Sequence, residues 1–242
     1  MTERTLLRWI VSDDLTDAQS SALLVSLDQT EQDRAMRFRF AEDRRDYVAA
    51  HALTRFMLGD VTGQAPKDLR FVFGRYGKPA LLTPSGQSSA PAFNLSHTRG
   101  CVAVALSATG DIGVDVEAIS RTVPDGIADR YFSRPELEAI HTAPDKDMAE
   151  RFFTYWTLKE AYLKATGLGI NIPLDRFAVA HDPPRLLFGP DEDHVAWHFH
   201  VERAASGFVI AVAHCDAEER AVTVSSAPFD LTRVCEISGF EL

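Results

Sequence analysis

The chain has 242 residues, 45% of them hydrophobic and 25% charged, with 35 acidic against 25 basic residues and a net charge of −10. These proportions are ordinary for a folded globular protein and exclude collagen, coiled-coil and disordered chains, while the acidic balance argues against nucleic-acid binding. Because no apolar stretch reaches the ~18 residues of a membrane helix and the N-terminus lacks the apolar core of a signal peptide, we expect a cytoplasmic protein without membrane contact.

The first half of the chain combines helical and strand patterns. Residues 16–40 have the composition of one or two polar helices, and apolar residues recur at helical spacing from 43 to about 59. Strands are predicted at 6–11, 69–73, 92–96 and 101–106.

The second half carries a similar pattern. The capping box from Ser133 to Glu136 predicts a short helix through about residue 140, and a longer helix runs from about 148 to 166, where glycines end it. Strands are predicted at 112–116, 176–179, 196–201, 208–213 and 221–224.

The two halves resemble each other weakly. Arg45 and Arg151 begin the two long helices, and Gly63 and Gly169 follow them, each pair being 106 residues apart. Two helix-plus-sheet units of similar length can align by chance, whereas a true repeat would make the protein a pseudo-dimer. The natural binding site then lies in a cleft between the halves.

Two carboxylates share one face of the strand around residue 115. Because side chains alternate along a strand, Asp115 and Glu117 project to one side while Val114 and Val116 project to the other. A solvated edge strand that uses charge to prevent aggregation has the same pattern. From this segment alone, that interpretation is at least as good as a functional one.

The long helix of the second half adds a third carboxylate. Trp156, Glu160 and Lys164 lie along one i, i+4 row of a helix whose aromatic residues predict burial. An exposed ion pair there would be a routine surface feature, but a buried carboxylate requires a cation. Asp115, Glu117 and Glu160 together make an oxygen-ligand set that suits Mg²⁺, with Lys164 in reach of a phosphate on the same ion.

Further residues that could bind a phosphate precede these carboxylates in the sequence. Ser96 and His97 end a predicted strand, where an imidazole can meet an anion, although a lone histidine is more often structural. Lys78, one of only five lysines, lies in a glycine-proline turn. Six arginines occur between residues 34 and 55; the interleaved acids predict a solvated helix face, from which a subset could still bind a phosphomonoester.

The segments YGKP, FNLSH, IGVDVE and WTLKEAYLK, in this order and spacing, resemble the signatures of the Sfp-type 4′-phosphopantetheinyl transferases. The family patterns G-(V/I)-D-(V/I)-E and W-(S/T)-x-K-E-(A/S)-x-x-K are matched without a gap at 113–117 and 156–164. The resemblance implies an α+β fold with a pseudo-twofold pair of similar helix-plus-antiparallel-sheet halves. The expected parts are residues 1–110 for the coenzyme A phosphates, 111–225 for the metal carboxylates, and a tail at 226–242.

The resemblance also implies an activity. It is the Mg²⁺-dependent transfer of the 4′-phosphopantetheine arm of coenzyme A to a serine of an apo acyl or peptidyl carrier protein, with release of 3′,5′-ADP. Asp115, Glu117 and Glu160 match the metal ligands, and Lys164 matches a lysine that contacts a coenzyme A phosphate. Asp115, Glu160 and Lys164 are then the catalytic set. The serine proton passes either to Glu160 or to a metal-bound water, and the residues do not choose between them.

The resemblance assigns residues to the remaining parts of coenzyme A less completely. The residues that match positions around its phosphates are Lys78, Ser96 and His97. Arg45 is the first choice for its 3′-phosphate, followed by Arg34 and Arg44. Glu31 and Tyr47 stand where some relatives carry a cation or a hydroxyl, so the nucleotide-end contacts stay open.

Two other functions are weighed against transfer. A non-catalytic module that binds coenzyme A or a carrier protein would be expected to lose a metal ligand or the phosphate lysine, and all four residues are present. Hydrolysis of the coenzyme A diphosphate also suits Mg²⁺, but the REx₂EE helix of the Nudix hydrolases is absent from the sequence. A chain of this length resembles the monomeric, often promiscuous enzymes of nonribosomal peptide and polyketide synthesis.

Overall fold

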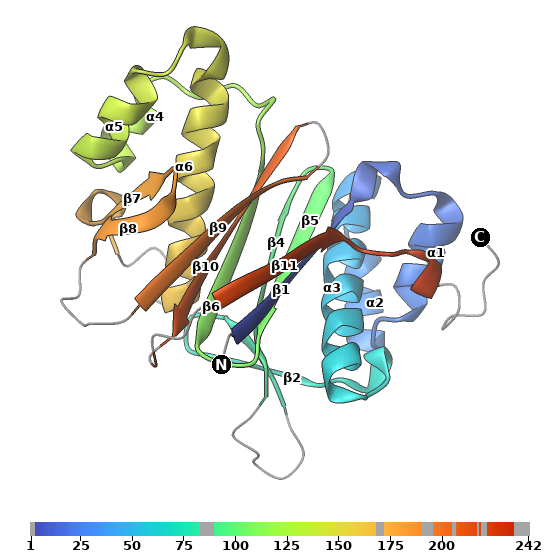
Figure 1. Ribbon diagram of the computed structural model, residues 1–242. Helices are drawn as coiled ribbons and strands as arrows, with labels where there is room; N and C mark the ends of the chain where they lie inside the picture. The colour runs from blue at the N-terminus through green and yellow to red at the C-terminus, as the bar shows by residue number, and fades with distance from the viewer. Residues whose placement is uncertain are drawn as a thin grey trace.

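The computed structural model describes residues 3–82, 90–167, 172–189, 196–204, 207–216, 218 and 222–234. Figure 1 shows two sheets packed face to face, with a long helix covering the outer side of each. The helices and strands of the first half are β1 (Glu3–Val11), α1 (Asp17–Val25), α2 (Gln29–Ala35), α3 (Ala41–Thr62), β2 (Phe71–Phe73), β3 (Pro79–Leu81), β4 (Ala92–Thr98) and β5 (Cys101–Ser107).

The second half repeats this order of elements. It contains β6 (Asp111–Ala118), α4 (Ile127–Tyr131), α5 (Arg134–His141), α6 (Asp145–Thr166), β7 (Ala178–His181), β8 (Pro184–Phe188), β9 (Ala196–Ala204) and β10 (Phe208–Asp216). In each half, one strand precedes three helices, and a 3₁₀ turn then leads into two hairpins. The predicted α+β pair of similar halves is therefore confirmed.

The strand pairing also corresponds between the sheets of the two halves. The first has the order β11-β1-β5-β4 and the second β6-β10-β9, so that β1 pairs antiparallel with β5 as β6 does with β10. Strand β11 (Val222–Pro228) returns to the first half and lies parallel to β1. The boundary expected between residues 225 and 226 thus falls inside a strand.

The two long helices give the offset between the two halves more accurately than the sequence does. Helices α3 and α6 both have 22 residues, and a glycine with positive φ, Gly63 or Gly167, follows each. Their first residues, Ala41 and Asp145, are 104 positions apart rather than the expected 106. Gly169, taken from the sequence as the partner of Gly63, lies outside the described residues.

Three apolar clusters hold these layers together. One lies between α3 and the first sheet, one between α6 and the second sheet, and one between the two sheets. Val114 and Val116 of β6 belong to the cluster between the sheets. Asp115 and Glu117 therefore share the opposite face of the strand, as predicted, and the structure shows that this face is the one turned toward α6.

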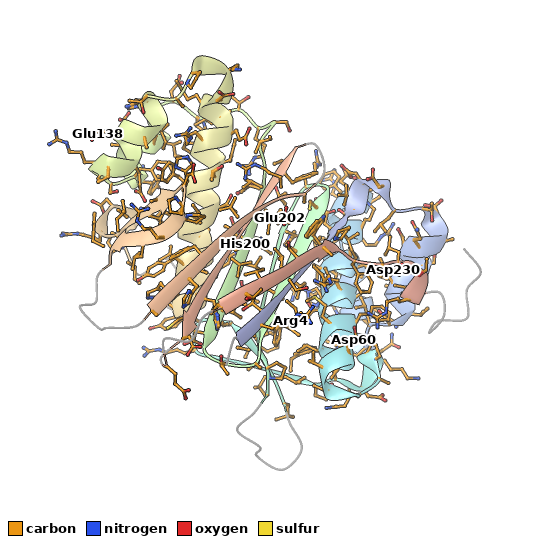
Figure 2. The ribbon with its side chains drawn as sticks, viewed as in Figure 1. Arg4, Asp60, Glu138, His200, Glu202 and Asp230 are labelled. Carbon is orange, nitrogen blue, oxygen red and sulfur yellow. The ribbon has the colours of Figure 1, made fainter. Side chains whose placement is uncertain are left out.

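The sheets also meet through polar contacts at their edges. Glu202 of β9 accepts a hydrogen bond of 2.6 Å from Ser226 Oγ of β11, and Figure 2 shows Glu202 beside β11 with His200 on the same strand. None of the helices that the structure describes is both long and apolar enough to cross a membrane.

One sequence interpretation is wrong in this region. Arg55 does not lie on a solvated helix face, because its side chain is only 1% exposed and pairs with Asp28 and Glu31 of the α2 capping box at 2.7 and 2.6 Å. It also donates to the carbonyl of Leu69, which follows the 3₁₀ turn. The spacing of charges along the sequence could not reveal this burial, since the partners lie on another helix.

Candidate active site

The centre of the site lies where β4, β6 and α6 meet. Gly113 of β6 faces α6 so closely that an added Cβ would lie 2.0 Å from the carbonyl oxygen of Ala161. Only a residue without a side chain permits this approach. The strand and the helix are thereby held together next to Asp115, two residues further along β6.

Lys164 joins these three elements. Its ammonium donates to Asp115 Oδ1 at 2.7 Å and to Ser96 Oγ at 2.8 Å, and Ser96 donates to the same carboxylate oxygen at 2.8 Å. Nearby, Asn94 Oδ1 accepts from the backbone amide of Val114 at 2.9 Å and so fixes β4 against β6. The structure therefore brings together three of the residues predicted from the sequence, each from a different element.

Asp115 is unusual because only one of its oxygens is used. Its side chain is buried, and Oδ2 has no hydrogen-bond partner. An unpartnered buried carboxylate oxygen is costly, since most buried polar atoms have a partner. This oxygen is thus free to accept a donor or a cation that enters the site.

The two glutamates lie in the same electrostatic environment. Burial raises the pKa of Glu117, and the charge of Asp115 raises it further, against the opposing effect of Arg121. Burial and Asp115 likewise raise the pKa of Glu160, with Lys164 opposing them. Carboxylates that repel one another in a partly desolvated place are stabilised by a shared cation.

The donor set of Asp115, Glu117 and Glu160 fits Mg²⁺, which prefers carboxylate oxygens. Among the residues that the structure describes, however, no three His, Cys, Asp or Glu side chains are close enough to form a ready-made metal cluster. Cations of the protein hold two of the carboxylates instead: Lys164 pairs with Asp115, and Arg121 donates to Glu117 at 2.5 Å.

The repulsion between the carboxylates predicts a pH effect on stability. A raised carboxyl pKa means that the folded chain binds the proton more tightly than the unfolded chain, so metal-free protein loses stability as the pH rises above the ordinary pKa of 4.5. The double variant Glu117→Gln, Glu160→Gln should therefore have the higher Tm in EDTA at neutral pH. Thermal unfolding followed by circular dichroism from about pH 5 to about pH 8 tests this. Identical Tm curves would contradict it.

Lys78 and His97 lie close to this centre. Lys78 Nζ donates to the carbonyl of Ala165, the residue after Lys164, at 3.0 Å. Burial lowers the pKa of His97, with Asp46 of α3 opposing this shift and Lys164 of α6 adding to it. His97, next to Ser96 in β4, thus lies within electrostatic reach of both long helices.

The arginines expected at the 3′-phosphate are separated from one another. Arg44 and Arg45 line a hollow of about 340 Å³ beside α1, and Arg45 pairs with Asp13. Arg34 lines a different hollow of about 550 Å³, with its guanidinium 5.5 Å from the ring centroid of Tyr47. The three arginines therefore do not converge on one place in this structure.

Glu31 and Tyr47 also have structural surroundings of their own. Glu31 binds His51 at 2.9 Å as well as Arg55, and its pKa is lowered by these partners despite burial. Burial first, and then Glu31, raises the pKa of Tyr47 to about 12. Glu31 is thus part of the packing between α2 and α3.

Sequence reasoning missed two polar residues of the site. Arg121 pairs with Glu117, and Thr98 Oγ1 lies 3.4 Å from the same carboxylate. The i, i+4 spacing of Glu117 and Arg121 is a weak signal, since it marks a pair only in a helix, whereas Glu117 lies in strand β6 and Arg121 follows that strand. Thr98 continues the row of Asn94 and Ser96 along β4, which was the better signal.

Comparison with known proteins agrees with this geometry. Residues 111–213 match the family model of the 4′-phosphopantetheinyl transferase superfamily, and residues 14–109 match that of the 4′-phosphopantetheinyl transferase N-terminal domain. The two matched segments together cover both halves of the fold, and they meet at the turn between β5 and β6.

Relatives match over most of their length. 4′-Phosphopantetheinyl transferase HetI of Nostoc sp. is 36% identical over 72% of this chain and 73% of its own. 4′-Phosphopantetheinyl transferase ffp of Bacillus subtilis is 31% identical over 77% and 86%, and Sfp of Bacillus subtilis strain 168 is 27% identical over 87% and 93%. The holo-[acyl-carrier-protein] synthase of Thermotoga maritima, with a TM-score of 0.38 over 44% of this chain and 62% of its own, is too distant to add to the argument. The resemblance found in the motifs is confirmed, and the chain belongs to the 4′-phosphopantetheinyl transferase superfamily.

Proposed function

We propose that this enzyme transfers the 4′-phosphopantetheine arm of coenzyme A to a serine of an apo acyl or peptidyl carrier protein in an Mg²⁺-dependent reaction. The observation that carries the proposal is the junction of Lys164, Ser96 and Asp115, with the second oxygen of Asp115 buried and unpartnered. A half-buried cation beside an unpaired, buried carboxylate oxygen suits a diphosphate together with its counterion.

In the proposed reaction, the serine oxygen forms a bond to the phosphorus that carries the pantetheine arm. The bond from that phosphorus to the bridging oxygen of the diphosphate breaks, and 3′,5′-ADP leaves with the electron pair. Glu160 takes the serine proton as the general base. Lys164, Lys78 and His97 surround the diphosphate and offset the charge that builds on the leaving group.

The metal belongs to the same proposal. Asp115, Glu117 and Glu160 would hold Mg²⁺, which supplies Lewis-acid neutralisation of the diphosphate charge. Lys164 and Arg121, now paired with two of these carboxylates, are the cations that would have to share them with the ion.

One incubation tests the function and separates it from the alternatives. An apo carrier protein is mixed with this protein, coenzyme A and Mg²⁺, and the products are examined by intact-protein mass spectrometry. A gain of one phosphopantetheine on the carrier, with 3′,5′-ADP in solution, supports transfer. Free phosphopantetheine with unmodified carrier indicates hydrolysis, and unchanged coenzyme A indicates a binding module.

Lys164→Met should weaken catalysis strongly. The variant keeps much of the side-chain volume but removes the ammonium that binds Asp115 and Ser96, so kcat/KM for coenzyme A should fall about 10²–10³-fold. Steady-state kinetics at varied coenzyme A measure this. Lys146→Met, at the other end of α6, is the matched control and should leave kcat/KM unchanged. Equal activity of the two variants would remove Lys164 from the proposed site.

The pathway is a further part of the proposal. The relatives include HetI, Sfp and gsp, all named 4′-phosphopantetheinyl transferases. We place the protein among the enzymes that activate carriers of nonribosomal peptide and polyketide synthesis, acting as a cytoplasmic monomer. A panel of apo carriers assayed in parallel, with size-exclusion chromatography of the enzyme, tests both statements.

A further inference from the structure

We infer that Asp46 of α3 is a positioning residue that acts through His97. Its buried carboxylate holds the turn between β4 and β5 against α3, and its charge keeps the His97 imidazole suited to a phosphate. In the sequence, Asp46 is one of the acids interleaved with the arginines, from which a solvated helix face is expected. The inference rests on the proposed function and adds to it a residue that does not touch coenzyme A itself.

His97 projects to the side of the first sheet that α3 covers. Phe93 and Leu95 pack into the apolar cluster of α3, and side chains two residues apart share a face of a strand. Ser96 faces the other way, where it donates to Asp115. The position of His97 therefore depends on how the end of β4 is held against α3.

Asp46 binds the turn that follows β4. Its side chain is 3% exposed; Oδ2 accepts the backbone amide of Gly100 at 3.4 Å, and Oδ1 accepts the hydroxyl of Ser12. The backbone amide of Ser12 in turn donates to the carbonyl of Gly100 at 2.8 Å. One carboxylate thus joins three segments, which are helix α3, the residue after β1, and the turn between β4 and β5.

Both residues of this turn are held close to the start of α3. Gly100 has a φ of +86°, in the left-handed region that favours glycine, and an added Cβ would collide with the carboxylate of Asp13. Arg99, the other turn residue, pairs with Glu42 of α3 at 3.1 Å. The end of β4, which carries His97, is therefore fixed relative to this helix.

Asp46 also acts on His97 through its charge. Both hydrogen bonds that Asp46 accepts in the described part of the chain come from neutral donors. Burial raises the pKa of the Asp46 carboxyl, and the positive charges of Arg45 and His97 are among the effects that oppose this rise. A carboxylate favours a cation nearby. The ionised Asp46 therefore favours the protonated form of His97, which is the form that binds a phosphate.

The other charges around His97 come from both long helices. Burial lowers the pKa of His97; Asp46 opposes this shift, as Asp43 does more weakly, while Lys164 and His51 add to it. Of the two carboxylates, Asp46 has the larger effect and is the buried one, whereas Asp43 is exposed. Substitution of Asp46 should therefore change the charge of His97 more than substitution of Asp43.

The test removes the charge of Asp46 but not its shape. Asp46→Asn keeps an oxygen for the amide of Gly100 and an amide group beside Ser12, so the turn can stay bound. Asp60→Asn is the matched control, because Asp60 pairs with Arg233 at 2.6 Å and lies at the other end of α3 (Figure 2). Both variants lose one negative charge, so a difference between them reports where the charge lies.

Calorimetry with coenzyme A measures the effect from about pH 5.5 to about pH 8.5 and needs no carrier protein. The affinity should fall as His97 loses its proton, and in Asp46→Asn this fall should occur at lower pH than in the wild type. At about pH 7.5 the variant should therefore bind coenzyme A about three- to tenfold more weakly, while at about pH 5.5 the two proteins should bind it equally. Asp60→Asn should follow the wild type at every pH.

A double-mutant cycle separates action through His97 from general damage to the fold. In a His97→Gln background, Asp46→Asn should leave the affinity for coenzyme A unchanged. An equal loss with and without His97, an equal loss at every pH, or no loss at all would overturn the inference. Binding of coenzyme A by the wild type without transfer to a carrier would contradict the proposed function alone.

The coupling can also be measured from the side of His97, in case circular dichroism shows that Asp46→Asn is unfolded. His97 is exposed, so His97→Gln should fold, and the coupling between two charges is reciprocal. Nuclear magnetic resonance should show that the pKa of the Asp46 carboxyl is higher in His97→Gln than in the wild type. An unchanged pKa of Asp46 would overturn the inference.

Discussion

Glu160→Gln should nearly abolish phosphopantetheine transfer while the protein stays folded. Glutamine has the shape of glutamate, but its amide neither accepts the serine proton nor carries the charge that helps to hold a divalent cation. Loss of a general base costs about 10²–10⁴-fold in rate, and loss of a metal ligand adds to this. Transfer to an apo carrier, followed by mass spectrometry under single-turnover conditions, measures the loss.

The control for this variant lies on the same helix. The Glu150 side chain is 45% exposed and pairs with Arg203, so Glu150→Gln changes the charge of α6 equally without touching the site. Calorimetric titration with Mg²⁺ gives a second readout, in which Glu160→Gln should bind the ion more weakly than Glu150→Gln. Transfer by Glu160→Gln at close to the wild-type rate would remove Glu160 from both proposed roles.

The parts of the site that the sequence predicts are those with short-range periodicity. Asp115 and Glu117 face α6 because strand side chains alternate, and Glu160 and Lys164 share a row because a helix repeats every 3.6 residues. Ser96 could be placed near them only through the family resemblance. The structure supplies the physical link, a hydrogen bond from Lys164 across 68 residues of sequence.

The parts that the sequence does not predict depend on contacts between distant segments. Periodicity gave no indication that Arg55 would be buried, or that Arg34 and Arg45 would line different hollows. Strand β8 was also missed, because it begins at the second of two adjacent prolines, which argue against a strand. Helix α4 has only five residues, too few for a helical pattern to be visible.

The two halves contain equivalent buried ion pairs. Arg55 in α3 and Lys159 in α6 are each the fifteenth residue of a 22-residue helix. Each binds a glutamate at the third position of a preceding helix, Glu31 or Glu136, which also closes that helix's capping box. The repeat found in the sequence therefore extends to a buried ion pair in each half. In the second half this pair stands directly beside Glu160 in the sequence.

Lys159→Met should accordingly destabilise the protein far more than a surface substitution. Lys159 is 1% exposed, and its ammonium lies 2.8 and 2.7 Å from the two carboxylate oxygens of Glu136, which is fully buried. Methionine fills a similar volume but leaves the charge of Glu136 without its cation, at a cost of about 3–5 kcal/mol in the free energy of unfolding. The Tm should fall by roughly 6–20 °C. Urea unfolding followed by circular dichroism measures the free energy directly.

The surface pair of α5 provides the reference for this value. Arg134 is 90% exposed and binds Glu138, which Figure 2 places at the outer edge of α5. Arg134→Met should therefore change the free energy of unfolding by less than about 1 kcal/mol. Because Glu136 also accepts from the amides of Ser133 and Val179, Lys159→Met with Glu136→Gln should recover part of the loss, as the charge disappears and the single amide oxygen of glutamine can keep one of these two bonds. If Lys159→Met is as mild as Arg134→Met, the buried pair does not hold α5 against α6.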